Sequence, residues 1–147
     1  MKQRFELELT SVMESLGYKC KKGSLTFVKN ISSNVSWSVF FQTLQSYPVG
    51  EKVTYIPRVG IRYKDVELTM RKLSEYLQSK KYVLDTVSTY LFNIVKEMPL
   101  HMDYTNKTAP EDFNAFILKM IEDWANPYFE KYSDIANSNN LFSGHIT

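Results

Sequence analysis

Apolar residues near the start of the chain recur at intervals of three and four residues, which is the period of one face of an α-helix. The positions that share this face are Phe5, Leu9, Val12, Met13 and Leu16. Gly17 follows them directly, at the place where a residue with a left-handed backbone often ends a helix. The pattern therefore predicts an N-terminal helix that buries its apolar stripe.

From Tyr18 to Tyr63 the period changes to two, which is typical of β-strands with one buried face. This pattern predicts a short strand at 18–22, a turn at 22–24 and strands near 25–31, 37–41 and 53–63. Short turns between consecutive strands predict an antiparallel meander. Pro57 lies inside the last strand and should place it at an edge or mark a bulge, because proline has no N–H to donate.

The second half of the chain returns mainly to helical spacing. One helix is expected from Asp65 to about Leu77, and another from the capping-box sequence 108–111, with Pro110 in its first turn. The core face of the latter would be Phe113, Phe116, Ile117, Met120, Ile121 and Trp124. Pro127 should end or kink it before a short last helix at 128–136. Residues 83–98 fit either a helix or a strand, and their β-branched content favours a strand at 86–94.

These elements predict a single α+β domain over residues 1–147. Its core would be an antiparallel β-sheet of about four to five strands, with the N-terminal helix and the C-terminal helices packed on it. The polar tail at 137–147 is expected to be frayed. The single cysteine cannot form an internal disulfide, and no apolar run approaches the length of a membrane span. Two carboxylates, Glu6 and Glu8, stand where a signal peptide would be apolar, so we expect a cytoplasmic protein.

The sequence lacks the usual signatures of catalysis: it has no phosphate-cradling glycine loop, no serine nucleophile elbow and no cysteine pair for zinc. His101 and Asp103 could form only a weak metal site. Cys20 stands among three lysines, whose charges would lower the pKa of its thiol, but we expect this cysteine to be structural or incidental. We therefore expect no catalytic residues, no metal and no cofactor.

Basic and aromatic residues alternate in the predicted strands, which raises the alternative of RNA or single-stranded DNA binding. The cations of this surface would be Lys19, Lys21, Lys22, Arg58 and Arg62, and the stacking faces Tyr18, Phe27, Trp37, Tyr55 and Tyr63. Phosphates need positive charge and bases need exposed rings. The same pattern also arises when the aromatic side chains pack inward and the cations are solvated on the opposite face.

The order of several short motifs resembles that of a known group of proteins. These motifs are Leu16–Tyr18 after the first helix, Trp37–Gln42, Val59–Tyr63 and Asn126–Tyr132. Together they resemble small bacterial domains found among immunity proteins of polymorphic toxin and contact-dependent growth inhibition systems. The resemblance spans about residues 5–135. It implies a non-catalytic inhibitor that binds a cognate toxin domain in the cytoplasm, and a general protein-interaction domain is a further interpretation.

The distribution of charge suggests where such a partner would bind. Residues 1–82 hold 14 Lys and Arg against 7 Asp and Glu, a net charge of +7, whereas residues 83–147 hold 4 against 9, a net charge of −5. A nuclease toxin would present a basic face, and complementary acidic charge would speed its association. The predicted toxin-binding residues are Asp112, Glu122, Asp123, Glu130 and Asp134, with Tyr128 or Tyr132 as aromatic anchors.

Overall fold

The computed structural model describes residues 2–21, 23–45, 52–66, 68 and 87–137. It confirms the α+β class, with a six-stranded antiparallel sheet whose strands are β1 (Lys19–Cys20), β2 (Thr26–Asn30), β3 (Val35–Gln45), β4 (Lys52–Tyr63), β5 (Val87–Tyr90) and β6 (Met102–Thr105). The first five strands lie in chain order, so the predicted meander is confirmed. The helix predicted at 65–77 and the turn region at 46–51 fall largely outside the described residues.

Both β5 and β6 pair with β4 on the side away from β3. β5 lies opposite Arg58–Ile61, and β6 lies opposite Lys52–Tyr55. The chain between them, residues 91–101, leaves the sheet and begins with the 3-10 helix η1 (Leu91–Asn93). The strand favoured at 86–94 is therefore confirmed only as far as Tyr90.

Pro57 lies within β4, which is a central strand, so the predicted edge position is wrong. The Phe41 N–H points away from β4 and donates to the Leu25 carbonyl oxygen at 3.1 Å. Phe41 and Pro57 are therefore a pair without mutual hydrogen bonds, and the proline nitrogen faces the opposite edge of β4. On that edge the pairing is interrupted between Arg58 and Tyr55, so the proline removes no ladder bond.

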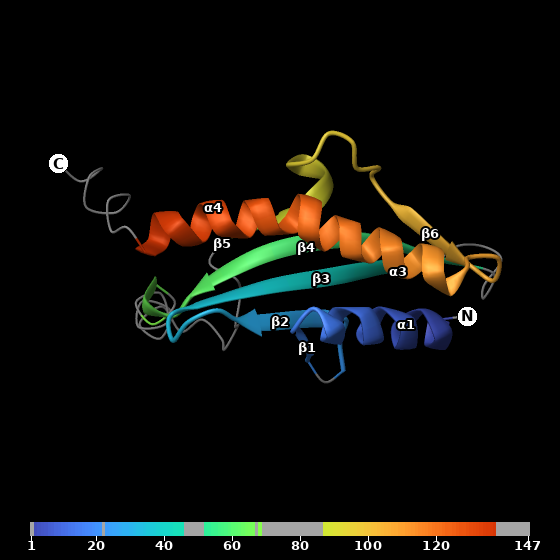
Figure 1. Cartoon of the computed structure of the whole chain (residues 1–147), viewed down its shortest axis with the longest axis horizontal. Coiled ribbons are helices and arrows are strands. Elements are labelled where there is room, and N and C mark those ends of the chain that lie inside the picture. Colours follow the sequence, from blue (N-terminus) through green and yellow to red (C-terminus); the bar gives the residue numbers. More distant parts are fainter. Residues whose placement is uncertain (1, 22, 46–51, 67, 69–86, 138–147) are drawn as a thin grey trace.

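The helices cover one face of the sheet (Figure 1). They are α1 (Lys2–Ser15), α3 (Pro110–Lys119), the π-helical segment η2 (Met120–Ala125) and α4 (Asn126–Asn137). Phe5, Leu9, Val12 and Met13 of α1 are buried as predicted. Gly17 has a φ of 91° and follows the helix end, which confirms its role as a stop.

The capping box predicted at the start of α3 is wrong. The N-cap residue is Ala109, which has no side-chain cap hydrogen bond. The Thr108 hydroxyl instead accepts a 2.9 Å hydrogen bond from the Thr105 N–H and closes the turn after β6. Because the Thr108 hydroxyl takes part in this turn, it does not cap the helix. Pro110 is the first residue of α3 and follows Ala109, whose backbone is extended.

Pro127 does not end the helix. The chain runs through α3, η2 and α4 as one helical rod (Figure 1). In a π-helical turn each N–H bonds the carbonyl oxygen five residues earlier, and not four residues earlier as in an α-helix. The hydrogen-bond pattern therefore changes just before Pro127, which in a regular α-helix would remove one hydrogen bond. Pro127 is the second residue of α4, so its missing N–H falls where the hydrogen bonds change from the π-helical to the α-helical pattern.

An aromatic cluster joins the N-terminal helix to the sheet and to α3. The Phe5 ring lies 5.1 Å from Tyr55, 5.3 Å from Tyr104 and 5.7 Å from Phe113, measured between ring centroids. Phe5 and Tyr104 have no exposed surface. Their burial removes large apolar areas from water. The cluster joins four elements, α1, β4, β6 and α3, because each contributes one of its rings.

A polar network closes the end of this cluster. The buried Tyr104 hydroxyl donates to the Glu8 carboxylate, which also accepts from Arg4 Nε at 3.2 Å. Arg4 Nη2 donates to the Thr108 carbonyl oxygen at 2.8 Å. Burial, and then the hydrogen bond to Glu8, raise the pKa of Tyr104 to about 12.

This pKa predicts a loss of stability at alkaline pH. The folded state holds the Tyr104 proton more tightly than the unfolded chain, whose tyrosine pKa is about 10. The stabilisation is therefore complete below pH ~10 and is lost as the pH rises to about 12, by roughly 2–3 kcal/mol. Urea unfolding at pH values across this window should show that decline, and Tyr104→Phe should remove about that much of it. An equal decline in both proteins would contradict the assignment.

Candidate functional site

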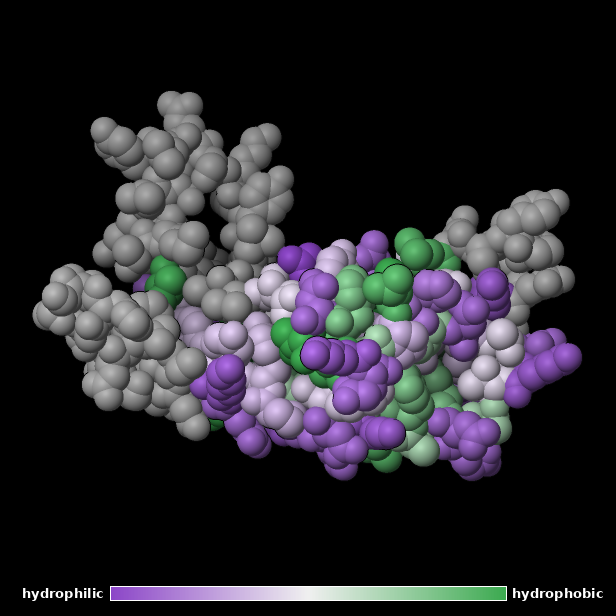
Figure 2. All heavy atoms as spheres, turned by 90° about the horizontal axis from the view of Figure 1, so that it is seen from above, coloured by the Kyte–Doolittle hydropathy of each residue, from purple (hydrophilic) through white to green (hydrophobic). Residues whose placement is uncertain are grey.

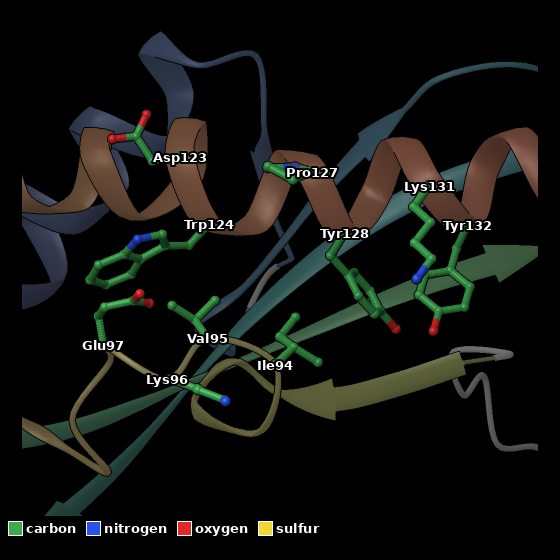
Figure 3. A pocket seen from close by; sticks show the side chains of 10 residues that line it. All are labelled: Ile94, Val95, Lys96, Glu97, Asp123, Trp124, Pro127, Tyr128, Lys131 and Tyr132. Carbon is green, nitrogen blue, oxygen red and sulfur yellow. The ribbon is translucent and has the colours of Figure 1, made fainter.

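A groove lies between the loop after β5 and the helical rod (Figure 3). Its volume is about 650 Å³, within the range of roughly 300–1,000 Å³ common for binding pockets. The loop contributes Ile94, Val95, Lys96 and Glu97, and the rod contributes Asp123, Trp124, Pro127, Tyr128, Lys131 and Tyr132. Three of the predicted site residues, Asp123, Tyr128 and Tyr132, are therefore brought together.

The helical wall of the groove is aromatic. Figure 3 shows the Trp124 ring above Val95 and Glu97, and the rings of Tyr128 and Tyr132 beside one another further along α4. The two tyrosine rings have centroids 4.8 Å apart and are inclined by 50°. Trp124 was predicted to belong to the core, but it is only half-buried because the π-helical turn shifts the positions that face inward.

Trp37 of β3 positions α4 over the sheet. Its indole is nearly parallel to the Phe129 ring, with centroids 4.8 Å apart and an angle of 10°. The indole N–H donates a 2.8 Å hydrogen bond to the Ser133 hydroxyl. The Tyr63 hydroxyl donates to the Tyr132 carbonyl oxygen at 2.7 Å. These contacts fix the helix that carries the aromatic wall.

The opposite wall is held by buried residues at both ends of its short loop. Leu91 has no exposed surface and Met98 is 5% exposed. The N–H groups of Ile94 and Val95 both donate to the Leu91 carbonyl oxygen at 3.1 Å. Ile94, by contrast, is 42% exposed. The backbone of the loop is therefore fixed by hydrogen bonds, while the apolar Ile94 side chain is exposed to solvent.

The remaining acidic candidates lie on the solvent side of the rod, which we name the acidic ridge. Its exposed charged residues are Glu111, Asp112, Lys119, Glu122, Asp123, Glu130 and Lys131, which give a net charge of −3. Asp112, Glu122 and Glu130 do not line the groove. Asp134 belongs to α4, and its side chain lies outside the described residues. On the face seen in Figure 2, hydrophobic side chains lie in small clusters among hydrophilic ones.

The basic residues of the nucleic-acid interpretation are separated from its aromatic residues. Tyr18, Phe27, Tyr55 and Tyr63 are buried and Trp37 is half-buried, all in the layer between sheet and helices. Arg58 and Arg62 occupy the opposite face of β4, and Lys19 and Lys21 are exposed near β1. Lys22 lies outside the described residues. None of these five predicted rings is exposed, so they do not form a stacking surface with these cations.

The Arg58 guanidinium is itself engaged on that opposite face. It donates to the Ser88 hydroxyl at 2.8 Å and lies 5.5 Å from the centre of the Tyr90 ring. The Tyr90 hydroxyl in turn donates to Gln42 Oε1 at 3.0 Å. This side chain therefore has protein partners in the sheet.

The pKa of the Cys20 thiol is raised, not lowered as its lysine neighbours in the sequence would suggest. Partial burial of the thiol, and then the negative charges of Glu14 and Glu6, raise its pKa. The side chain is exposed at the protein surface and its Sγ lies 3.2 Å from the Ser24 carbonyl oxygen. The neighbouring lysines in the sequence therefore do not make this cysteine a thiolate.

His101 and Asp103 do lie on the same side of the chain, with Nδ1 and Oδ1 4.0 Å apart. The Asp103 carboxylate accepts a 2.7 Å hydrogen bond from the Thr54 hydroxyl, and this bond lowers its pKa. Lys52 lies 3.5 Å from the same carboxylate. Among the described residues, no group of three or more possible ligands surrounds a metal position.

Sequence reasoning missed the loop wall and Trp124. Residues 83–98 fit helical and strand spacing alike, so their pattern did not identify 94–97 as a loop. Trp124 followed the helical spacing and therefore looked like a core residue. Pro127 inside a helical pattern was the one available sign that the helix changes its geometry there.

No protein-family model, curated protein or solved structure matches this chain. Within residues 2–137, as far as they are described, no helix has the length and apolar character needed to cross a membrane.

Proposed function

We propose that this chain is a non-catalytic binding domain that neutralises a toxin protein by forming a stoichiometric complex with it, as the resemblance to immunity proteins implies. The observation that carries the proposal is the aromatic groove between residues 94–97 and the helical rod. Trp124 and Tyr132 are half-buried there, so each keeps a ring edge available to a partner. Trp and Tyr side chains are enriched among the residues that contribute most to binding at protein interfaces.

Charge supports a partner with a basic surface. The acidic ridge borders the groove through Asp123, which belongs to both. A net charge of −3 along one helix attracts a basic protein over about a Debye length, which is roughly 8 Å at physiological salt. This attraction raises the association rate more than it lowers the dissociation rate. A nuclease toxin, whose active site must hold phosphates, would present such a surface.

The first experiment identifies the partner. The tagged protein is purified from its native host and the co-purifying species are identified by mass spectrometry. We expect one protein in equal amount, whose expression alone arrests growth and whose effect is relieved by co-expression of this chain. Recovery of nucleic acid in place of a protein would overturn the proposal and favour the basic surface.

The same partner then tests the groove by surface plasmon resonance. Trp124→Ala should weaken binding by about thirtyfold, since a central aromatic anchor contributes roughly 2 kcal/mol. Glu122→Lys with Asp123→Lys should slow association by about tenfold at low salt, and the difference should shrink as salt is added.

The comparison for the charge change is Glu111→Lys with Asp112→Lys at the other end of the acidic ridge, which distinguishes binding centred on the groove from binding spread along the ridge. It makes the same change of charge on the same rod, about 16 Å along the helix from Asp123. We expect a much smaller change in association rate for this pair, because the charges lie beyond a Debye length. Equal effects of both pairs would show that the position of the charge does not matter. Normal binding by Trp124→Ala would show that the groove does not bind the partner.

A further inference from the structure

One edge of the sheet carries a stretch of β3 without a strand beside it. β2 pairs with Ser36–Phe40 only, and the Phe41 N–H donates to the Leu25 carbonyl oxygen. From there to its end, β3 keeps β4 on one side, and the described strands leave its other side open. Figure 1 shows β3 continuing past the start of β2 alongside α1.

Thr43 presents open backbone groups in this stretch. Backbone groups along a strand point alternately to its two edges. Because the Phe41 N–H points to the β2 side, the N–H and C=O of Thr43 point there as well. A donor and an acceptor spaced in this way are satisfied by another extended backbone, which is how peptides add to sheet edges.

A helix forms the other wall of this edge. Lys2, Glu6 and Thr10 of α1 recur every four residues and line a groove of about 550 Å³ together with Leu25 and Phe40–Thr43. The stretch from Lys2 to Thr10 rises about 12 Å, which is the length of about four residues of extended chain. A strand edge facing a helix over this distance fits one peptide segment.

Two apolar side chains of β3 mark this stretch: Phe40 is the last residue paired with β2, at the start of the stretch, and Leu44 lies within it. Phe40 is 37% exposed and Leu44 is 45% exposed. Open strand edges are usually protected by charged residues or proline, and an apolar edge invites pairing. An added strand would place every second side chain on one face, next to Leu44 and diagonally from Phe40. Lys2 and Glu6 carry opposite charges, so the helical wall favours neither an acidic nor a basic peptide.

The geometry points to strand addition at this edge: it binds an extended peptide segment of a partner protein, about four residues long, whose alternate apolar side chains cover Phe40 and Leu44. This site goes beyond the proposed function, because it lies at the opposite edge of the sheet from the groove that contains Trp124.

A phage-displayed library of short random peptides, selected on the full chain, supplies the probe. We expect the selected peptides to carry apolar residues at alternate positions. Thr43→Pro removes the outward N–H and leaves the hydrogen bonds between β3 and β4 in place. Calorimetry should therefore show an affinity for a synthetic consensus peptide that is about tenfold lower. Thr43→Val keeps the N–H and should bind like the wild type, and Trp124→Ala should also bind normally.

Two further measurements keep the test decisive. If circular dichroism shows that Thr43→Pro does not fold, the double variant Phe40→Ser with Leu44→Ser replaces it and should weaken peptide binding by about tenfold. In the wild type, bound peptide should slow amide exchange at Thr43. Selected peptides without alternation, or unchanged binding by these variants, would overturn the inference. A dimer in sedimentation velocity that Thr43→Pro converts to a monomer would also overturn it and assign the edge to a second copy.

Discussion

Phe5→Ala should lower the free energy of unfolding by about 3–5 kcal/mol, which is the range for removing a fully buried phenylalanine ring. Phe5 has no exposed surface and contacts the rings of Tyr55, Tyr104 and Phe113. Because these residues come from β4, β6 and α3, the cavity would open where α1 meets three other elements. Urea unfolding followed by circular dichroism measures the change.

The matched control lies two residues away on the same helix. Leu7 is 66% exposed, so Leu7→Ala should change the unfolding free energy by less than about 0.5 kcal/mol. A loss below about 1 kcal/mol for Phe5→Ala would show that the neighbouring side chains collapse into the space and that the aromatic cluster does not hold α1 to the sheet.

Long periodic segments were predictable, because their burial follows the spacing of their own residues. The stripe of α1 and the alternation in β3 and β4 give both the element and its buried face. β6 was missed because four residues cannot establish a period, and its pairing with β4 depends on contacts far away in the chain. Local sequence also could not show that the Thr108 hydroxyl closes a turn and leaves the helix uncapped.

The candidate site was predictable on one wall only. Tyr128, Tyr132 and Asp123 share a helix, so sequence proximity placed them together. The facing residues 94–97 reach the groove because two short strands use the same edge of β4 and the chain between them must leave the sheet. Trp124 is directed to the groove by a π-helical turn, whose presence before a proline depends on tertiary packing.

Trp37→Ala should lower the free energy of unfolding by about 3 kcal/mol, because it removes a stacked ring and leaves a buried hydroxyl without its donor. The indole stacks on Phe129 and donates to Ser133, which is 7% exposed. Both partners belong to α4, so the loss should concentrate there, and amide exchange in α4 should accelerate more than in β3. Binding of the proposed partner should weaken as well, because Tyr128 and Tyr132 depend on the position of this helix.

Trp37→Phe and Ser133→Ala separate the hydrogen bond from the ring. Trp37→Phe keeps an aromatic face against Phe129 and should lower the free energy of unfolding by about 1–2 kcal/mol. If the 2.8 Å hydrogen bond accounts for this loss, the double variant should lose less than the sum of the two single changes. Two results would contradict this: strictly additive losses of unfolding free energy, or equal amide-exchange rates along the helical rod in Trp37→Ala. Either would show that other contacts hold α4, namely the Tyr63 hydrogen bond and the buried Phe129.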